Sequence, residues 1–346
     1  MSVKTRRGDA SYADALLAVR DLKVHFRVKR EPSAWAAWRE KALLRAVDGV
    51  SFDVGRGETV GLVGESGCGK STLARAIVGL SPVTSGSIRW QGVETVNDGR
   101  RPGAAIQALR RGVQMIFQDP LASLDPRMTI GRIVAEPLRT RRSHMARAEV
   151  RARVATMLER VGMNAHYLER YPHEFSGGQC QRIGIARALI AEPRLVVCDE
   201  PVSALDVSVQ AQVVNLLRDL QRELSLSMLF VAHDLAVVKS ISHRVLVMYL
   251  GRVMEVGERQ ALYANPRHPY TRALLYAVPV ANPAIERSRS RVLLQGDLPS
   301  PLDPPSGCVF RTRCPEAIDA CAQRVPPLEV HEGQCRRVAC IRAVSP

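Results

Sequence analysis

The feature that most constrains this chain is a glycine-rich segment between an apolar stretch and a helical pattern. Residues 59–63 are apolar and strand-like, and the next segment reads Gly64-Glu65-Ser66-Gly67-Cys68-Gly69-Lys70-Ser71-Thr72, which fits G-x-x-x-x-G-K-[ST]. Glycines let successive backbone N–H groups turn inward at a helix N-terminus and form a cradle for anions. We therefore expect a phosphate-binding loop in which Lys70 reaches the β- and γ-phosphates and Ser71 ligates Mg²⁺. A glycine-rich turn with a chance lysine is the alternative.

An apolar strand further along the chain ends in two acidic residues. Residues 195–198 are apolar, and Asp199 and Glu200 follow them. Alone, Asp199 would serve equally well as a helix cap. Beside a phosphate loop, phosphoryl transfer needs one carboxylate in the Mg²⁺ shell and another that orients or deprotonates the attacking water. We assign the first role to Asp199 and the second to Glu200.

A serine and a glycine pair stand at the start of a predicted helix. Ser176-Gly177-Gly178-Gln179 precedes the apolar-periodic residues 183–190. Ser176 is a natural N-cap, but the N–H groups of the two glycines also offer a second anion site. His233 follows the predicted strand at residues 228–232, and Gln118 lies in residues 115–120. Neither of these two residues is distinctive alone.

Apolar patterning along the chain predicts alternating strands and helices. Strand-like segments, the first two at residues 16–19 and 24–26, occupy much of residues 16–63. Residues 128–175 are helical and polar, and strand and helix alternate from residue 195 to residue 250. Such alternation implies an α/β fold with a mainly parallel sheet covered by helices. Beyond residue 257, a proline-rich linker at residues 279–306 leads into a small cysteine-bearing tail. The first 15 residues are expected to be a disordered tail.

The charge balance is strongly basic, which raises the question of a nucleic-acid partner. The 346 residues include 49 Lys+Arg and 34 Asp+Glu, a formal net charge of +15. The 46% hydrophobic content excludes a wholly disordered or fibrous chain. Part of the arginine excess lies between Arg139 and Arg160, without the interleaved aromatic residues of a nucleic-acid groove. We expect no nucleic-acid partner and a basic surface near anionic lipid.

Neither a membrane-spanning segment nor an export signal is expected. No apolar run reaches the roughly 18 to 20 residues that a transmembrane helix needs. The first ten residues are basic but lack the apolar segment of a secretory signal behind the charges.

The order of the motifs along residues 16–257 resembles the ATP-binding subunits of ABC transporters. The motifs are residues 64–72, Gln118, Ser176 to Gln179, Asp199-Glu200, Ser203-Ala204-Leu205-Asp206 and His233. The resemblance implies a P-loop NTPase (RecA-like) core with an N-terminal antiparallel β subdomain and a helical insert subdomain at about residues 120–190. It implies that Mg²⁺ is held by Ser71, Gln118 and Asp199. The residues implied in ATP hydrolysis are Glu200, His233, Gln118 and Lys70.

The same resemblance implies a head-to-tail dimer with two ATP molecules between its subunits. Ser176, Gly177 and Gly178 would close over the ATP of the partner, and Asp206 would link the two sites. Phe26 is our choice for the aromatic residue that stacks on adenine, with Trp35 and Trp38 as alternatives. The implied nucleotide contacts are Phe26, Gly64, Glu65, Ser66, Gly67, Cys68, Gly69, Lys70, Ser71, Thr72, Gln118, Asp199, Ser176, Gly177, Gly178, Gln179 and Asp206. Cys180, where close relatives usually have Arg, implies a mild loss of efficiency at the partner's site.

Residues 258–346 resemble the C-terminal extension of oligopeptide and dipeptide importer ATPases, through residues 265–275 and the cysteines. The resemblance implies the second of two paired ATPases, on the cytoplasmic face of the inner (plasma) membrane. Its partners would be a paralogous ATPase, two transmembrane permease subunits and, indirectly, an extracytoplasmic peptide-binding protein. Dipeptide, oligopeptide, glutathione and nickel chelate remain open as cargo. The alternative class is a non-transport ABC protein acting on nucleic acid or ribosomes.

The last 39 residues contain five cysteines. Their spacing lacks the C-x₂-C pairs of common zinc sites, and Pro315 follows Cys314 as it often follows a cluster ligand. The importer resemblance implies a [4Fe–4S] cluster on Cys308, Cys314, Cys321 and Cys340, with Cys335 left over. Zinc, or reduced thiols without metal, are the alternatives.

Overall fold

The computed structural model describes residues 15–29, 41–141, 145–277, 296–330 and 336–343. Three groups of expectations fall outside these ranges. They are the disordered tail, except for its last residue, most of the proline-rich linker, and the side chains of Trp35, Trp38 and Cys335.

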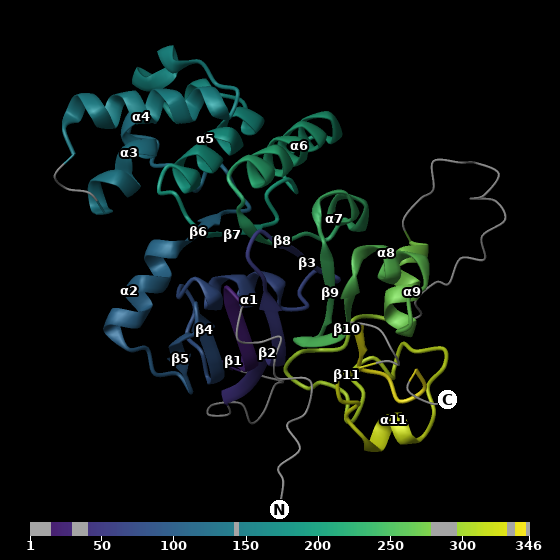
Figure 1. Ribbon diagram of the computed structural model, residues 1–346. Helices are drawn as coiled ribbons and strands as arrows, with labels where there is room; N and C mark the ends of the chain where they lie inside the picture. The colour runs from purple at the N-terminus through teal and green to yellow at the C-terminus, as the bar shows by residue number, and fades with distance from the viewer. Residues whose placement is uncertain (1–14, 30–40, 142–144, 278–295, 331–335, 344–346) are drawn as a thin grey trace, which may run out of the picture.

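A parallel sheet forms the centre of the molecule. Its parallel strands lie in the order β9-β3-β8-β7-β6 (Figure 1). Their bounds are β3 Thr59–Val63, β6 Val113–Ile116, β7 Leu195–Asp199, β8 Ser227–Val231 and β9 Arg244–Tyr249. Strands β3, β7 and β8 are buried at every position, as expected of apolar runs covered on both faces. The predicted α/β class is confirmed.

An antiparallel sheet packs on one face of the parallel sheet across helix α1 (Lys70–Ile77). It has the order β2-β1-β4-β5. The bounds are β1 Leu17–Lys29, β2 Lys41–Val54, β4 Ser85–Trp90 and β5 Val93–Asn97. Leu73 and Ile77 of α1 share an apolar cluster with Leu17 of β1 and Leu62 of β3. The helix is therefore enclosed between the two sheets, which fixes the position of its first turn.

Strand β1 corrects one expectation from the sequence. The two segments expected at residues 16–19 and 24–26 belong to a single strand. Its register against β2 shifts three times between Val19 and His25, and Asp21 has a left-handed φ of 41°. These irregularities interrupt the alternation of apolar and polar residues, so the sequence pattern looks like two short strands.

A group of helices lies beyond the parallel sheet, on the side away from β1 and β2 (Figure 1). Its α-helices are α3 Ile130–Arg141, α4 Arg147–Arg160 and α5 Gly177–Leu189, and its 3₁₀ turns are η1 Ala165–Glu169 and η2 Pro172–Glu174. In α4 the buried residues Val150, Val154, Met157 and Leu158 recur at helical spacing. This stripe packs with α3 and α5, so the arginines of α4 face outward.

Six further α-helices are described outside α1 and the helical group. They are α2 Gly103–Gly112, α6 Val207–Glu223, α7 Leu235–Ile241, α8 Arg259–Ala264, α9 Pro269–Tyr276 and α11 Ala320–Gln323. Among the described residues, no helix combines the length and the apolar character that crossing a membrane requires.

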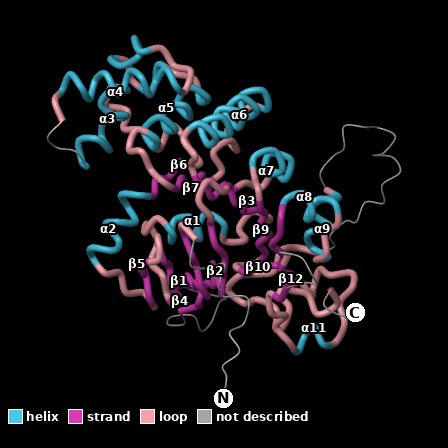
Figure 2. The backbone as a smooth tube through the Cα atoms, in the orientation of Figure 1, coloured by secondary structure: helices cyan, strands magenta, loops and turns pink. Residues whose placement is uncertain are grey.

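The C-terminal extension adds strands to the edge of the parallel sheet (Figure 2). Strand β10 (Arg252–Glu258) pairs antiparallel with β9, β12 (Arg337–Val338) pairs with β10, and β11 (Glu329–Val330) pairs with β12. The backbone N–H of Ala339 also donates to the carbonyl of Met254 at 2.8 Å. The cysteine-bearing tail is thus tied to the sheet that carries the phosphate loop, which the sequence pattern did not predict.

Two buried contacts anchor the extension. Glu255 is fully buried, and its carboxylate accepts backbone N–H groups of Arg267 and His268 at 3.0 and 2.9 Å and lies 3.4 Å from Arg336 Nε. This pairing offsets the cost of burying a charge. Tyr249, Tyr270 and Phe310 form an aromatic cluster with ring centroids 4.8 to 5.3 Å apart.

Phe310→Ala tests how much of the fold depends on the aromatic cluster. Because Phe310 is fully buried, truncation should lower the free energy of unfolding by about 3 kcal/mol or more. Urea denaturation without nucleotide measures the change. Val325→Ala is the control, since Val325 is 53% exposed in the same extension and should cost less than about 0.5 kcal/mol. Equal effects of the two variants would show that the cluster has no special role.

Candidate functional site

The phosphate loop connects β3 to α1 in the predicted strand–loop–helix arrangement. Gly69 precedes the first turn of α1 and has a left-handed φ of 102°. A Cβ at this position would lie against the carbonyl oxygen of Ala46, so both the backbone conformation and the space require glycine. In the residues just before Gly69, Ser66 and Gly67 are exposed and Cys68 is buried. Cys68 can therefore offer the ligand its backbone but not its side chain.

Lys70 lies across this loop. It is only 4% exposed, and its Nζ donates to the carbonyl oxygens of Gly64 and Glu65 at 2.9 and 3.0 Å. Nζ also lies 3.8 Å from Glu200 Oε1. A buried ammonium held by the loop it spans is placed to meet an anion bound there.

Ser71 and Asp199 form the second contact of the site. Ser71 Oγ donates to Asp199 Oδ1 at 2.7 Å. Burial raises the pKa of Asp199, although the Ser71 hydrogen bond and the charge of Arg75 act in the opposite direction. Within the described part of the chain, Asp199 Oδ2 is buried and accepts no hydrogen bond. A hydroxyl beside an unsatisfied carboxylate oxygen suits Mg²⁺, which prefers oxygen ligands, so these residues fit the ion that the resemblance implies.

Two of the predicted residues, Gln118 and His233, lie beside the carboxylate of Glu200. Its Oε2 accepts a hydrogen bond from Gln118 Nε2 at 3.2 Å and lies 3.4 Å from His233 Nδ1. Glu200 has a left-handed φ of 47°, a conformation that costs a non-glycine residue roughly 1–2 kcal/mol. Since β6, β7 and β8 are parallel neighbours, the residues that follow them meet at one edge of the sheet. The carboxylate can orient a water molecule beside the phosphate loop.

The second predicted anion site lies at the start of α5. Ser176 and Gln179 form a reciprocal capping box, in which Ser176 N donates to Gln179 Oε1 at 3.0 Å and Gln179 N to Ser176 Oγ at 3.4 Å. A Cβ on Gly178 would lie 2.5 Å from Val209, so this glycine allows α5 to approach α6 closely. Both glycines are partly exposed. Among the described residues, no hydrogen bond or ion pair connects residues 176–179 to the phosphate loop.

Asp206 is the N-cap of α6. Its carboxylate accepts Val209 N at 3.0 Å and the Ser208 hydroxyl at 2.7 Å, and these hydrogen bonds lower its pKa. Asp206 is exposed, and the neighbouring Val207 is 82% exposed.

Two further expectations concern single side chains. Phe26 lies half-buried on β1 and packs on the cluster that contains α1, and its contact with adenine stays a prediction. Cys180 is fully buried, with its Sγ 3.5 Å from the carbonyl of Pro172. The cysteine side chain therefore lies inside the helical group and cannot itself touch a partner's nucleotide.

The sequence reasoning missed two residues that contact the loop from the extension. The hydroxyl of Tyr270 accepts a hydrogen bond from Glu65 N at 2.9 Å, and Arg313 Nη1 donates to Glu65 Oε2 at 2.7 Å. Tyr270 belongs to the segment that indicated the importer extension, and Arg313 precedes Cys314. Nothing in their local sequence pointed to the phosphate loop.

The four cysteines implied in a cluster meet in the extension. Cys308, Cys314, Cys321 and Cys340 line one cavity, together with apolar residues such as Phe310. Burial, followed by the neighbouring thiols, raises the pKa of Cys314 to about 11. Within the described ranges, no group of three or more His, Cys, Asp or Glu side chains is arranged to hold a single metal ion.

A groove opens beside Gln118 where the helical group meets the sheet. Its volume is about 830 Å³. The lining comes from α1, α2, β6, α3, α5 and the loops between elements, and includes Leu80, Phe117, Gln118, Pro137 and Arg187. Leu80 is 60% exposed. The groove thus brings apolar surface next to a residue of the nucleotide site.

Comparison with known proteins identifies two family models in the chain. A model described as ABC transporter matches residues 47–203, and one described as the oligopeptide/dipeptide transporter C-terminal region matches residues 254–321. The oligopeptide transport ATP-binding protein OppF of Escherichia coli is 59% identical over 326 residues, which cover 93% of this chain and 96% of OppF. OppF of Haemophilus influenzae is 54% identical, over 96% of this chain and 98% of that protein.

Solved structures share the fold of the first part of the chain. CbiO1 from Clostridium perfringens, described as part of the ABC transporter complex cbiONQ, aligns with a TM-score of 0.60 and 27% identity over 73% of this chain and 92% of its own. The dimeric structure of MJ0796, a bacterial ABC transporter cassette, aligns with a TM-score of 0.60 and 25% identity over 70% of this chain and 98% of its own.

Asp199→Asn tests the assignment of the metal ligand. Asn can still accept the Ser71 hydrogen bond but removes the charge that Mg²⁺ prefers, so binding of a fluorescent ATP analogue with Mg²⁺ should weaken at least about tenfold. Binding in EDTA should change little. Asp125→Asn, at a carboxylate whose side chain is 40% exposed and pairs only with Arg127 among the described residues, is the control. A variant with undiminished Mg²⁺ dependence would remove Asp199 from the metal site.

Proposed function

We propose that this chain, which belongs to the oligopeptide transport ATP-binding proteins of the ABC transporter family, hydrolyses ATP to energise the import of oligopeptides. The observation that carries the proposal is the convergence of Lys70, the Ser71–Asp199 pair and Glu200 on one loop. The match of residues 254–321 to the oligopeptide/dipeptide region and the relatives named for oligopeptide transport favour peptide cargo.

The residues in and around the loop suggest how the chain binds and hydrolyses ATP. Backbone N–H groups of residues 64–72 bind the phosphates, and Lys70 neutralises the β- and γ-phosphates. Ser71, Asp199 and Gln118 would hold Mg²⁺, which supplies charge neutralisation on the phosphate oxygens when bound. Glu200 orients and deprotonates the attacking water, and His233, 57% exposed in the single chain, contacts the γ-phosphate side. Phe26 stacks on adenine in this proposal.

A second subunit completes the site. Gly177 and Gly178 present N–H groups, and Ser176 a hydroxyl, at the start of α5, and no contact within the described chain brings them to its own phosphate loop. We propose that they close over ATP bound by a paralogous ATPase, and that Asp206 and Val207 lie at the interface. The related cassette MJ0796 has a dimeric structure, which supports this arrangement.

The groove beside Gln118 is the proposed contact for the membrane subunits. Its position joins the helical group to the nucleotide site, so a permease segment seated there would sense whether ATP is bound. Two permease subunits and, indirectly, an extracytoplasmic peptide-binding protein complete the proposed transporter. The chain would then work at the cytoplasmic face of the plasma membrane.

The cysteine cavity is proposed to hold a [4Fe–4S] cluster. Cys308, Cys314, Cys321 and Cys340 provide four thiols around one cavity, the number that such a cluster needs. The four thiolates would ligate the iron atoms of such a cluster. Phe310, Pro326 and Ile341 line the same cavity and would cover part of it, next to the charged side chains of Arg311, Glu316 and Arg342.

Glu200→Gln tests the proposed chemistry. Gln keeps the size of the side chain but cannot take a proton, so kcat for ATP hydrolysis should fall at least about hundredfold, while ATP binding persists. Steady-state phosphate release and nucleotide titration measure the two effects. Lys70→Ala is the contrasting variant, since it should lose nucleotide affinity itself. Unchanged hydrolysis by Glu200→Gln would refute the role of Glu200.

Anaerobic purification tests the cluster. The wild-type chain should contain about four iron atoms and matching sulfide, and Cys314→Ser should lose most of this iron together with the visible absorbance. Cys335→Ser, at the cysteine left out of the proposed set, should keep the iron. A colourless wild-type protein with stoichiometric zinc would rule the cluster out.

A further inference from the structure

Glu65 is an acidic side chain inside a loop that binds anions, and the mechanism above makes no use of its charge. Because ATP is strongly negative, an uncompensated carboxylate here would repel it. Arg313 Nη1 donates to Glu65 Oε2 at 2.7 Å. The side chain of Arg313 is only 9% exposed and that of Glu65 25% exposed. Water therefore screens the pair incompletely. The extension therefore supplies the positive charge that neutralises Glu65.

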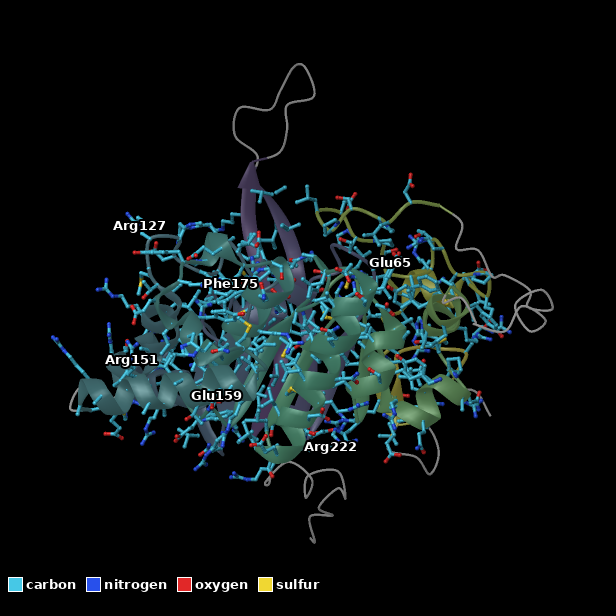
Figure 3. The ribbon with its side chains drawn as sticks, turned by 90° about the horizontal axis from the view of Figure 1, so that it is seen from above. Glu65, Arg127, Arg151, Glu159, Phe175 and Arg222 are labelled. Carbon is cyan, nitrogen blue, oxygen red and sulfur yellow. The ribbon has the colours of Figure 1, made fainter. Side chains whose placement is uncertain are left out.

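The backbone of Glu65 is held from the same side. Its N–H donates to the Tyr270 hydroxyl at 2.9 Å, and its carbonyl oxygen accepts from Lys70 Nζ at 3.0 Å. Glu65 thus connects the extension to the lysine assigned to the phosphates. Figure 3 shows Glu65 on the side of the molecule where the yellow ribbon of the extension lies, whereas Phe175 lies over the helical group.

Both partners of Glu65 are anchored in the aromatic cluster. Tyr270 is one of its three rings and is fully buried. The guanidinium carbon of Arg313 lies 5.9 Å from the ring centroid of Tyr249, and Arg313 N donates to the carbonyl of Phe310 at 3.0 Å. The extension therefore holds Glu65 through packed groups and not through a loose surface contact.

We propose that Arg313 is a positioning residue of the nucleotide site, which neutralises and orients Glu65 so that the C-terminal extension sets the affinity of the phosphate loop for ATP. The inference rests on the proposed binding of ATP to this loop and adds a role for the extension. Two effects act together. Pairing removes the repulsion between Glu65 and the phosphates, and the contacts to Arg313 and Tyr270 hold the loop in a single conformation, which reduces the ordering cost of binding.

Three variants of the full chain separate these effects from simple stability. They are Arg313→Met, Glu65→Gln and the double variant, each titrated with ATP and Mg²⁺ and assayed for hydrolysis. Arg313→Met leaves the carboxylate unpaired beside the phosphates, so Kd should rise about tenfold. KM should rise in parallel, while kcat at saturating ATP stays within about twofold, since Glu200 and His233 are untouched. Arg313→Lys, which keeps the charge, should recover most of the affinity.

The double variant gives the decisive comparison. If the unpaired charge causes the loss, adding Glu65→Gln to Arg313→Met should restore Kd to that of Glu65→Gln alone. Arg272→Met is the matched control, because it breaks an Arg–Glu pair in the same extension, Arg272 Nη2 to Glu316 Oε1 at 2.6 Å, away from the loop. It should keep the wild-type Kd, and thermal unfolding without nucleotide reports the stability of every variant.

Several outcomes would overturn the inference. A Kd of Arg313→Met within twofold of wild type, an equal loss in Arg272→Met, or a double variant no better than Arg313→Met would each do so. These results leave the proposed function standing, provided that the wild-type chain binds ATP. A wild-type chain that binds no ATP would overturn the proposed function and the inference together.

Discussion

The nucleotide site depends on the position of a single buried ammonium group, that of Lys70. The glycine-rich loop bends around it and supplies two carbonyl oxygens, and the carboxylate of Glu200 approaches from the end of β7, which β8 separates from β3. This geometry requires α1 to begin at Lys70, which in turn requires the left-handed conformation and the missing side chain of Gly69. The enclosure of α1 between two sheets keeps this helix start in place.

The C-terminal extension is packed into the same unit as the phosphate loop. Its strands continue the edge of the parallel sheet through β10, and its aromatic cluster includes Tyr249, the last residue of β9. Since β9 is hydrogen-bonded to β3, the strand that leads into the phosphate loop, the extension is held against the loop by the central sheet itself. A region that the sequence marks as an addition thus contacts the phosphate loop directly, through Tyr270 and Arg313.

Other features suit the proposed pairing with a second subunit. The glycines of α5 are partly exposed, and the hydrogen bonds of the capping box pair only Ser176 with Gln179. Val207 stands exposed beside Asp206. In the proposed sandwich of two cassettes, the partner would cover the apolar side chain and give the N–H groups of the two glycines a phosphate to bind.

The sequence by itself determined the fold class, the phosphate loop and the acidic pair, because each rests on a local pattern: a strand, a turn that only glycine permits, and a helix. The family resemblance grouped Gln118, Asp199, Glu200 and His233, and the structure brings them together because residues after parallel strands meet at one sheet edge. Only the tertiary structure decided that Cys180 points inward and that Arg313 and Tyr270 hold Glu65. Contacts between residues 205 and 248 positions apart leave no periodicity in the chain, because they depend on how distant elements pack and not on local backbone geometry.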